Sequence, residues 1–293
     1  MGTRVEHVAG YESPSRVVLD SEVSEIRLLL QEYAGVLIDR PSEVLAEIIA
    51  DFLASHRLTS ASELIGAMRA RPEEGEALLE LLLPGDTAFF RKPEIFQAFQ
   101  KQLLASMQPK KNGDTLRPLR IWSAGCSTGE EAYSIGISIC EAFQRDNSGW
   151  NAHIVAGDIR RNALKTAERG LYPASLLAQV PRSLVAAYFA RMGEHFLVKP
   201  RLRNLVTFTR MNLIEPAFMG RFDCIFCLDV LPHLSTAGKT ALWQRLQLSL
   251  EPGGYIFLAE KEQLPPGATF IQHSAPGCSY YQRPLAAVAR SGM

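Results

Sequence analysis

A short glycine-containing segment holds the residues best suited to binding a ligand. Its sequence is Ala124-Gly-Cys-Ser-Thr-Gly-Glu-Glu131, and it lies between an apolar run at 119–123 and a helical pattern at 131–144. Glycines let the backbone approach a ligand closely, and a helix start offers free N–H groups. No lysine follows the second glycine, so the segment is not a phosphate-binding loop. The two glutamates instead favour a ligand with an ammonium or sulfonium centre.

Carboxylates also end two later strand-like runs. Asp158 ends the run at 152–157, where a carboxylate in a doubly wound sheet accepts hydrogen bonds from ribose hydroxyls. Asp229 ends the run that begins at Phe222, and a helical stretch and the turn Pro252-Gly-Gly254 follow. This order of glycine turn, carboxylate-ended strands and Pro-Gly-Gly turn is typical of adenosylmethionine-dependent methyltransferases.

The elements that must position these residues alternate along the chain. We expect strands at 119–123, 152–157, 205–210, 222–227 and 254–259, helices at 131–144, 161–169 and 236–250, and an extended pair near 268–283. Such alternation predicts a mostly parallel sheet with helices on both faces, a Rossmann-like α/β fold. The segment 172–204 interrupts the pattern and is expected to be a small inserted β-subdomain within a domain spanning 119–293.

The N-terminal part of the chain shows helical periodicity in place of alternating strands and helices. Apolar pairs at 44/45, 48/49 and 52/53 form one stripe, and Ser60 and Glu63 have the spacing of a helix-capping box. We expect an all-α domain at 21–84 after a mobile segment at 1–20. Residues 85–118 are expected to form a linker, with a polar loop near 110–115 and a helix from Pro93 to about Met107.

Composition excludes several classes of protein. Apolar residues make up 47% of the 293 residues and charged residues 21%, as in soluble globular proteins. No apolar run is long enough to cross a membrane, and the first residues lack the apolar core of a signal peptide.

The five scattered cysteines predict reduced thiols in the cytoplasm. Cys224 and Cys227 have no second pair of metal ligands to complete a site, so no metal is expected. No basic patch with interleaved aromatics supports nucleic-acid binding.

Charge is divided unevenly although the total is zero. Residues 1–83 contain seven cationic and fifteen anionic side chains, a net of −8, and residues 84–293 carry the balancing +8. The two ends are therefore either two solvated surfaces of opposite bias or two different partner surfaces.

Six motifs together give a closer resemblance than the general fold does. The chain from about residue 22 to 283 resembles the CheR-type chemotaxis-receptor glutamate methyltransferases at Thr87-Ala-Phe-Phe-Arg91, Ala124–Glu131, Gly170-Leu-Tyr172, Asn212-Leu213, Phe222–Cys227 and Pro252-Gly-Gly-Tyr255. The resemblance implies an N-terminal helical domain, a linker and an adenosylmethionine-binding domain with an inserted β-subdomain. It further implies transfer of a methyl group from S-adenosylmethionine to a glutamate carboxylate of a signalling protein, which leaves S-adenosylhomocysteine.

The resemblance also implies roles for single residues. Thr87 and Arg91 lie beside the cofactor, and Arg91 holds the acceptor carboxylate; Asp158 binds the ribose. Asn212 and Leu213 line the adenine end. The other expected cofactor contacts are Ala124, Gly125, Glu131, Leu228 and Asp229.

The chain departs from the family pattern at several of these positions. Gly85 replaces the usual Asn, Ala132 a Pro, Leu228 an Arg and Asp229 an Asn, and His233 stands where a Tyr is expected. The changes at 228 and 229 make this wall more negative by about two charges. Asp229 could still accept a hydrogen bond from the cofactor. His233 either takes the polar role of the Tyr, as a catalytic residue, or is a satisfied loop histidine.

The expected partner surface differs as well. The helix that is basic in the family and faces an acidic receptor carries Glu43, Glu47 and Asp51 here, which disfavours a conventional receptor on that face. The basic run 199–203 is another docking candidate, or else a solvated strand pair. A catalytically impaired module that binds the cofactor and acts as a scaffold or sensor is the alternative to an enzyme.

Overall fold

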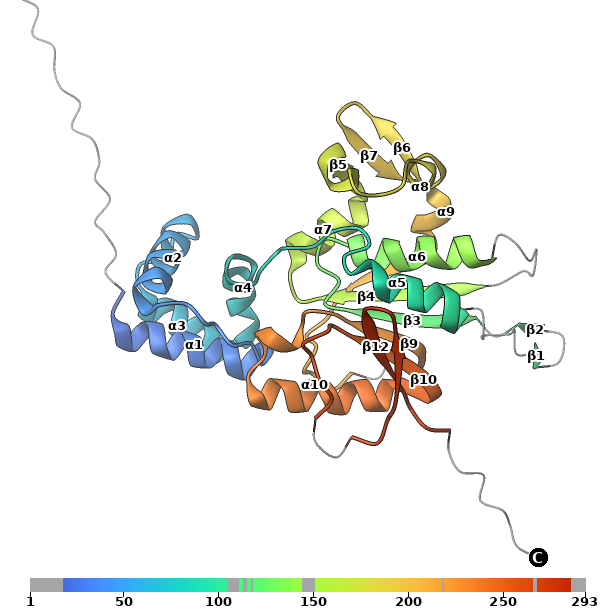
Figure 1. The fold of residues 1–293 in the computed structure, drawn as a ribbon. Coiled ribbons are helices and arrows are strands. Elements are labelled where there is room, and N and C mark those ends of the chain that lie inside the picture. Colours follow the sequence, from blue (N-terminus) through green and yellow to red (C-terminus); the bar gives the residue numbers. More distant parts are fainter. Residues whose placement is uncertain are drawn as a thin grey trace, which may run out of the picture.

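The computed structural model describes residues 18–104, 111–112, 115–116, 118–143, 151–217, 219–265 and 268–285 (Figure 1). The front of this part is helical, with α1 (Asp20–Ala34), α2 (Ser42–Ser55), α3 (Ala61–Ala70), the 3-10 turn η1 (Pro72–Gly75) and α4 (Glu76–Leu82). The predicted stripe of α2 is buried at Leu45, Ile49, Phe52 and Leu53. The Ser60 hydroxyl accepts the Glu63 N–H at 3.2 Å and so begins α3. All but the last three residues of the segment predicted to be mobile lie outside the described residues.

A connecting region joins the helical front to the sheet. α5 (Pro93–Ala98) continues as the π-helical η2 (Phe99–Leu104), and the predicted end of this helix near Met107 lies outside the described residues. The polar loop expected near 110–115 was wrong in part, because β1 (Lys111–Asn112) and β2 (Thr115–Leu116) pair there as a short antiparallel ribbon.

A seven-stranded sheet forms the centre of the molecule. Its order is β11-β12-β10-β9-β3-β4-β8, and β10, β9, β3, β4 and β8 are mutually parallel. The strands are β3 (Leu119–Ala124), β4 (Ala152–Asp158), β8 (Val206–Arg210), β9 (Phe222–Cys227) and β10 (Leu250–Leu258), and the antiparallel edge is β11 (Ile271–Ala275) with β12 (Cys278–Gln282). The predicted mostly parallel sheet is confirmed.

The two faces of the sheet bury different helices. Alternate residues of a strand point to opposite faces, and Trp122 and Ile225 pack with α10 (Thr236–Ser249), whereas Ile121 and Phe226 pack with α6 (Glu130–Phe143) and α5. The helix α7 (Arg161–Arg169) connects β4 to the inserted segment. Helices on both faces are therefore confirmed (Figure 1).

The inserted segment forms a small antiparallel sheet of order β5-β7-β6 (Figure 1). Its elements are β5 (Leu171–Pro173), η3 (Ala174–Leu177), α8 (Arg182–Tyr188), β6 (Phe189–Met192), β7 (His195–Val198) and α9 (Pro200–Arg203). Phe89 of the linker makes edge contacts with Tyr172 at 5.0 Å and Phe189 at 5.4 Å between ring centroids. These contacts fasten the linker to the inserted sheet.

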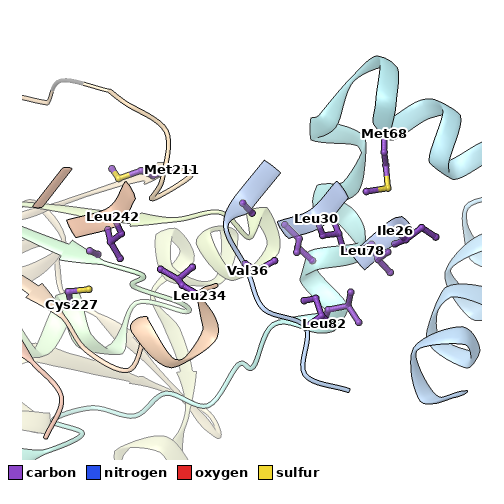
Figure 2. Close-up of a cluster of buried hydrophobic side chains, with 14 of the residues drawn as sticks. Ile26, Leu30, Val36, Met68, Leu78, Leu82, Met211, Cys227, Leu234 and Leu242 are labelled. Atoms are coloured by element: carbon purple, nitrogen blue, oxygen red, sulfur yellow. The ribbon is translucent and has the colours of Figure 1, made fainter. Parts of the chain in front are cut away.

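The helical front shares one hydrophobic core with the sheet. Figure 2 shows Ile26, Leu30 and Leu78 of the front in the same cluster as Leu234 and Leu242, with Val36 between the two groups. Val36 and Leu234 also form an isolated antiparallel bridge. The front is thus packed against the loop that follows β9. No helix within the described ranges is both long enough and apolar enough to span a membrane.

Candidate functional site

A cavity of about 330 Å³ opens where the parallel strands end. The carboxyl ends of β3, β4, β8 and β9 supply one side, and the linker and the end of α1 close the other. Ligands of open α/β sheets bind at this edge. Ten of the predicted site residues line the cavity: Thr87, Arg91, Gly125, Glu131, Asp158, Asn212, Leu213, Leu228, Asp229 and His233. Ala124 does not, because it is buried as the last residue of β3.

The glycine turn is shaped by backbone geometry. Gly125 has a φ of 83°, and a Cβ there would stand 2.7 Å from Val230. The N–H groups of Gly125 and Cys126 both donate to the Gly157 carbonyl, at 2.8 and 3.0 Å. These two amides are therefore paired with β4 and are not available to a ligand. The buried Ser127 hydroxyl, however, lines the cavity and has no protein partner within the described ranges.

Asp158 is buried at the end of β4 and is shared among several donors. It accepts the Ser127 N–H at 2.8 Å and the Arg160 N–H at 2.9 Å. The Arg160 guanidinium approaches the same carboxylate at 3.2 Å and also donates to the Pro84 carbonyl at 2.9 Å. A ribose at Asp158 must share the carboxylate with Arg160. A Cβ built on Gly85 would make an ordinary van der Waals contact with the Arg160 guanidinium at 3.7 Å, so this position would accept a side chain.

Glu131 lies in the first turn of α6 and faces the cavity. Its carboxyl group accepts the Ser123 hydroxyl at 2.6 Å. Burial raises the pKa of Glu131 to about 8, with Asp229 and Glu262 adding to the rise while the Ser123 hydrogen bond and Lys92 oppose it. Its neighbour Glu130 points elsewhere, because it binds the hydroxyls of Thr128 and Thr87. Only one of the two predicted glutamates therefore reaches the ligand space.

The side of the cavity formed by the linker and the loop after β9 holds a charge cluster that the sequence did not reveal. Lys92 Nζ lies 2.5 Å from Asp229 Oδ1, and Arg91 Nε lies 3.6 Å from Asp229 Oδ2. Arg91 also donates to the Asp86 carbonyl. The predicted excess of negative charge at Asp229 is therefore offset by Lys92, whose side chain comes from the linker 137 residues away.

Glu262 is a second residue missing from the sequence-based prediction. It is buried, and its carboxylate accepts the N–H groups of Ala259, Asp229 and Leu231 at 2.7, 3.2 and 2.8 Å. It fixes the loop after β9 and so orients Asp229. Nothing in the sequence around Glu262 indicates these three partners.

Asn212 and His233 connect the cavity to the helical front. The Asn212 amide donates to the Tyr33 carbonyl at 2.7 Å, which is a structural contact, and its adenine-facing role stays a prediction. The His233 carbonyl accepts the Leu37 N–H at 2.7 Å. Its ring has no hydrogen-bond partner within the described ranges and lines the cavity, which disfavours a satisfied loop histidine. Burial lowers the pKa of His233; the Asp229 charge opposes this and Arg160 adds to it.

Backbone strain gathers around the cavity. Five residues other than glycine have positive φ in the described ranges, and Lys92, Ser127 and Asp229, at 62°, 50° and 58°, line the cavity. Phe90, at 53°, stands beside Arg91. Such residues persist where the surrounding structure enforces them, commonly at functional sites.

The residues present fit S-adenosylmethionine. A free buried hydroxyl at Ser127, the carboxyl group of Glu131 and the carboxylate of Asp158 match the polar and cationic parts of that molecule. Leu213, Leu228 and Phe96 supply the apolar lining that a purine ring needs.

Two other sequence features lie outside the cavity. Cys224 and Cys227 are buried in β9 and belong to clusters on opposite faces of the sheet, so they cannot share a metal ion. The basic run 199–203 forms the turn α9 rather than a strand pair. Lys199 donates to the Ala186 and Ala187 carbonyls and Arg203 to the Glu168 carbonyl, so both cations cap helix ends.

Comparison with known proteins agrees with this geometry. A family model described as CheR methyltransferase, SAM binding domain, matches residues 85–276. Chemotaxis protein methyltransferase Cher2 of Pseudomonas putida is 30% identical over 271 residues, which are 88% of this chain and 97% of that protein. Chemotaxis protein methyltransferase 2 of Pseudomonas aeruginosa is 32% identical over 249 residues, covering 82% of this chain and 86% of its own. These similarities reach beyond the matched domain.

Proposed function

The chain belongs to the CheR methyltransferase family and is an adenosylmethionine-dependent methyltransferase, and from this premise we propose that it methylates a glutamate carboxylate of a signalling protein. The proposal rests on one observation, which is that two sets of side chains from different parts of the chain line the same cavity. Glu131 and Asp158 come from the glycine-turn side, and Thr87 and Arg91 come from the linker.

On the cofactor side, each residue has a distinct task. Asp158 binds ribose hydroxyls together with Arg160, and the Ser127 hydroxyl offers a further hydrogen bond. Glu131 faces the cationic part of the cofactor. Bound S-adenosylmethionine supplies a methyl group on a sulfonium, which a carboxylate oxygen takes up as a methyl ester while the sulfur keeps the bonding electron pair.

On the acceptor side, the task is positioning. A glutamate carboxylate is already ionised near neutral pH, so it needs no base to become a nucleophile. Arg91 can hold such a carboxylate through its guanidinium and aim one oxygen into the cavity. The half-exposed position of Arg91, 47% accessible, suits a residue that must meet an incoming protein.

The partner belongs to the class that the relatives' names indicate, a chemotaxis or related signalling protein. The exposed stripe of Glu43, Glu47 and Asp51 on α2 favours a partner surface with basic residues, unlike an acidic receptor segment. The five cysteines are all unpaired, which supports a reducing, cytoplasmic location.

Methyl transfer to carboxylates has a direct assay. Purified protein with methyl-labelled S-adenosylmethionine should label proteins of a native lysate as base-labile esters that release methanol. Arg91→Ala should abolish the labelling and leave S-adenosylhomocysteine binding by calorimetry within about threefold. The matched control is Arg69→Ala on α3, whose side chain is 65% exposed and does not line the cavity. Equal labelling by Arg91→Ala and the wild type would exclude the proposed role of Arg91.

A further inference from the structure

We propose that Arg91 and Lys92 together form the binding site for the acceptor carboxylate, and that Asp229 occupies this site as an internal competitor until the acceptor displaces it. The inference rests on the proposed methylation of a carboxylate and names the residues that select the acceptor. It assigns Lys92 a role in acceptor specificity.

The Asp229 carboxylate lies between two cationic side chains. Oδ1 lies 2.5 Å from the Lys92 ammonium and Oδ2 lies 3.6 Å from the Arg91 guanidinium, so each oxygen faces a different cation. An acceptor carboxylate held between the same two cations would make the same pair of contacts. Asp229 therefore stands in for the substrate group at the mouth of the cavity.

Partial exposure makes this carboxylate displaceable. The side chains of Arg91, Lys92 and Asp229 are 47%, 23% and 33% exposed. Ion pairs at this level of exposure contribute little to stability, because water screens them. The buried pair of Asp158 with Arg160, by comparison, is less than a tenth exposed on either side and would be costly to separate.

The backbone at Asp229 does not require a carboxylate. Its φ of 58° is a left-handed conformation, which glycine and asparagine also adopt readily. Its N–H is held by Glu262 at 3.2 Å whatever the side chain is. The aspartate is therefore needed for its charge and not for the path of the chain.

Lys92 is held in a strained conformation that aims it at this site. Its φ is 62°, it precedes Pro93 at the start of α5, and its carbonyl accepts the Ile95 N–H at 3.0 Å. Backbone strain of this kind is commonly retained at functional sites. A lysine that served only solubility would need no such conformation.

An internal competitor has a consequence for the choice of acceptor. A tethered carboxylate has a high effective concentration, so a free small acid displaces it poorly. An acceptor that brings further contacts, as a folded protein does, can compensate for the competition. The Asp229 carboxylate thereby favours macromolecular acceptors over metabolites that carry the same group.

Binding of a blocked glutamate tests the inference without relying on catalysis. N-acetyl-L-glutamate methylamide is titrated into the protein, with and without saturating S-adenosylhomocysteine, and followed by NMR. Asp229→Asn and Asp229→Gly should each bind this probe about tenfold more tightly than the wild type, the size expected for a charge-assisted contact. Adding Lys92→Met to Asp229→Asn should remove the gain. Glu74→Gln, which deletes a carboxylate that does not line the cavity, should change nothing.

Two results would overturn the inference. One is probe binding no tighter in both Asp229 variants, with thermal melting showing that at least one is folded. The other is a tenfold or greater loss of S-adenosylhomocysteine affinity in both, which would place Asp229 among the cofactor ligands. If the variants gain probe affinity but the wild type labels no protein with methyl groups, the proposed function fails while the carboxylate site stands.

Discussion

The two halves of the cavity are built by different means. The half proposed to bind the cofactor, Gly125 to Glu131 with Asp158, is mostly buried and is fixed by backbone turns and short hydrogen bonds. The half proposed to bind the acceptor, Arg91 and Lys92 with the loop 228–233, is partly exposed and is held by ion pairs between distant segments. Burial ties the first half to the stability of the fold, whereas the second half can change its charges and leave the fold intact.

The largest difference between the halves should be in stability. Asp158→Asn removes one member of a buried ion pair and leaves the Arg160 guanidinium uncompensated. We expect a loss of about 3–5 kcal/mol in the free energy of unfolding. Asp229→Asn, in the exposed pair, should cost less than about 1 kcal/mol. Urea denaturation followed by circular dichroism measures both.

The double variant Asp158→Asn with Arg160→Met is the control for this comparison. Replacing both charges should restore most of the lost stability, because no buried charge is left alone. It should not restore binding of S-adenosylhomocysteine if Asp158 holds the ribose. Equal stability losses at Asp158 and Asp229 would contradict the division into a buried and an exposed half.

The second-largest effect is expected at the glycine turn, where the rate of methyl transfer should change. Gly125→Ala places a Cβ 2.7 Å from Val230 at a φ of 83°, so the turn must shift. We expect the methyl-transfer rate to fall on the order of a hundredfold, as a displacement near 1 Å can cause. Gly66→Ala on α3, where no atom lies within 4 Å of the new methyl group, is the matched control and should be neutral or slightly stabilising. A normal rate in Gly125→Ala would show that the turn does not position the cofactor.

The third effect depends on pH and concerns Glu131, whose carboxyl group lines the cavity. With its pKa raised to about 8, Glu131 is mostly protonated at pH 7 in the free protein. A cationic cofactor favours the ionised form, so S-adenosylmethionine affinity should rise by up to about tenfold per pH unit from pH 6 to 8. Calorimetry in buffers of different ionisation enthalpy should also detect a proton released on binding.

The same group predicts the opposite trend in the stability of the free protein. The folded pKa lies above the ordinary value of 4.5, so the folded state binds more protons than the unfolded state between pH 4.5 and 8. Its contribution to stability is present below pH 4.5 and is lost as pH rises toward 8. Glu131→Gln should flatten the trend in affinity and weaken the trend in stability, to which Glu130 and Glu262, whose pKa values burial also raises, contribute as well. A pH-dependent affinity that survives this substitution would assign the proton to another residue.

The sequence predicted the cofactor half better than the acceptor half for a physical reason. The glycine turn and the acid at Asp158 are contiguous motifs whose function depends on local backbone geometry, and the cavity contains both. Lys92, Arg160 and Glu262 were missed because each acts through a contact made by folding. A lysine after Arg91 or a glutamate after β10 carries no local signal of its partner.

Prediction of the fold from the sequence has the same limit, which is that contacts between distant segments leave no local signal. Apolar periodicity predicted the strands and the helices of both faces, since burial on one or two faces leaves a repeating pattern. It could not show that the helical front shares its core with the sheet, or that Val36 pairs with Leu234, because those contacts join separate elements. The division at residues 84 and 118 stays a prediction, as one hydrophobic cluster extends across the first of these boundaries.

The smallest effect is expected at His233, and it tests whether the acceptor half needs an acid or a base. Burial lowers the pKa of His233, so the ring is neutral at pH 7. A glutamate acceptor is ionised at that pH and gives up no proton, so His233→Gln should change kcat by less than about threefold at saturating cofactor. His56→Gln at the exposed end of α2 is the control. A kcat profile whose acid-side inflection disappears in His233→Gln, together with a tenfold fall in rate, would instead show that proton transfer limits the reaction and that positioning by Arg91 is not sufficient.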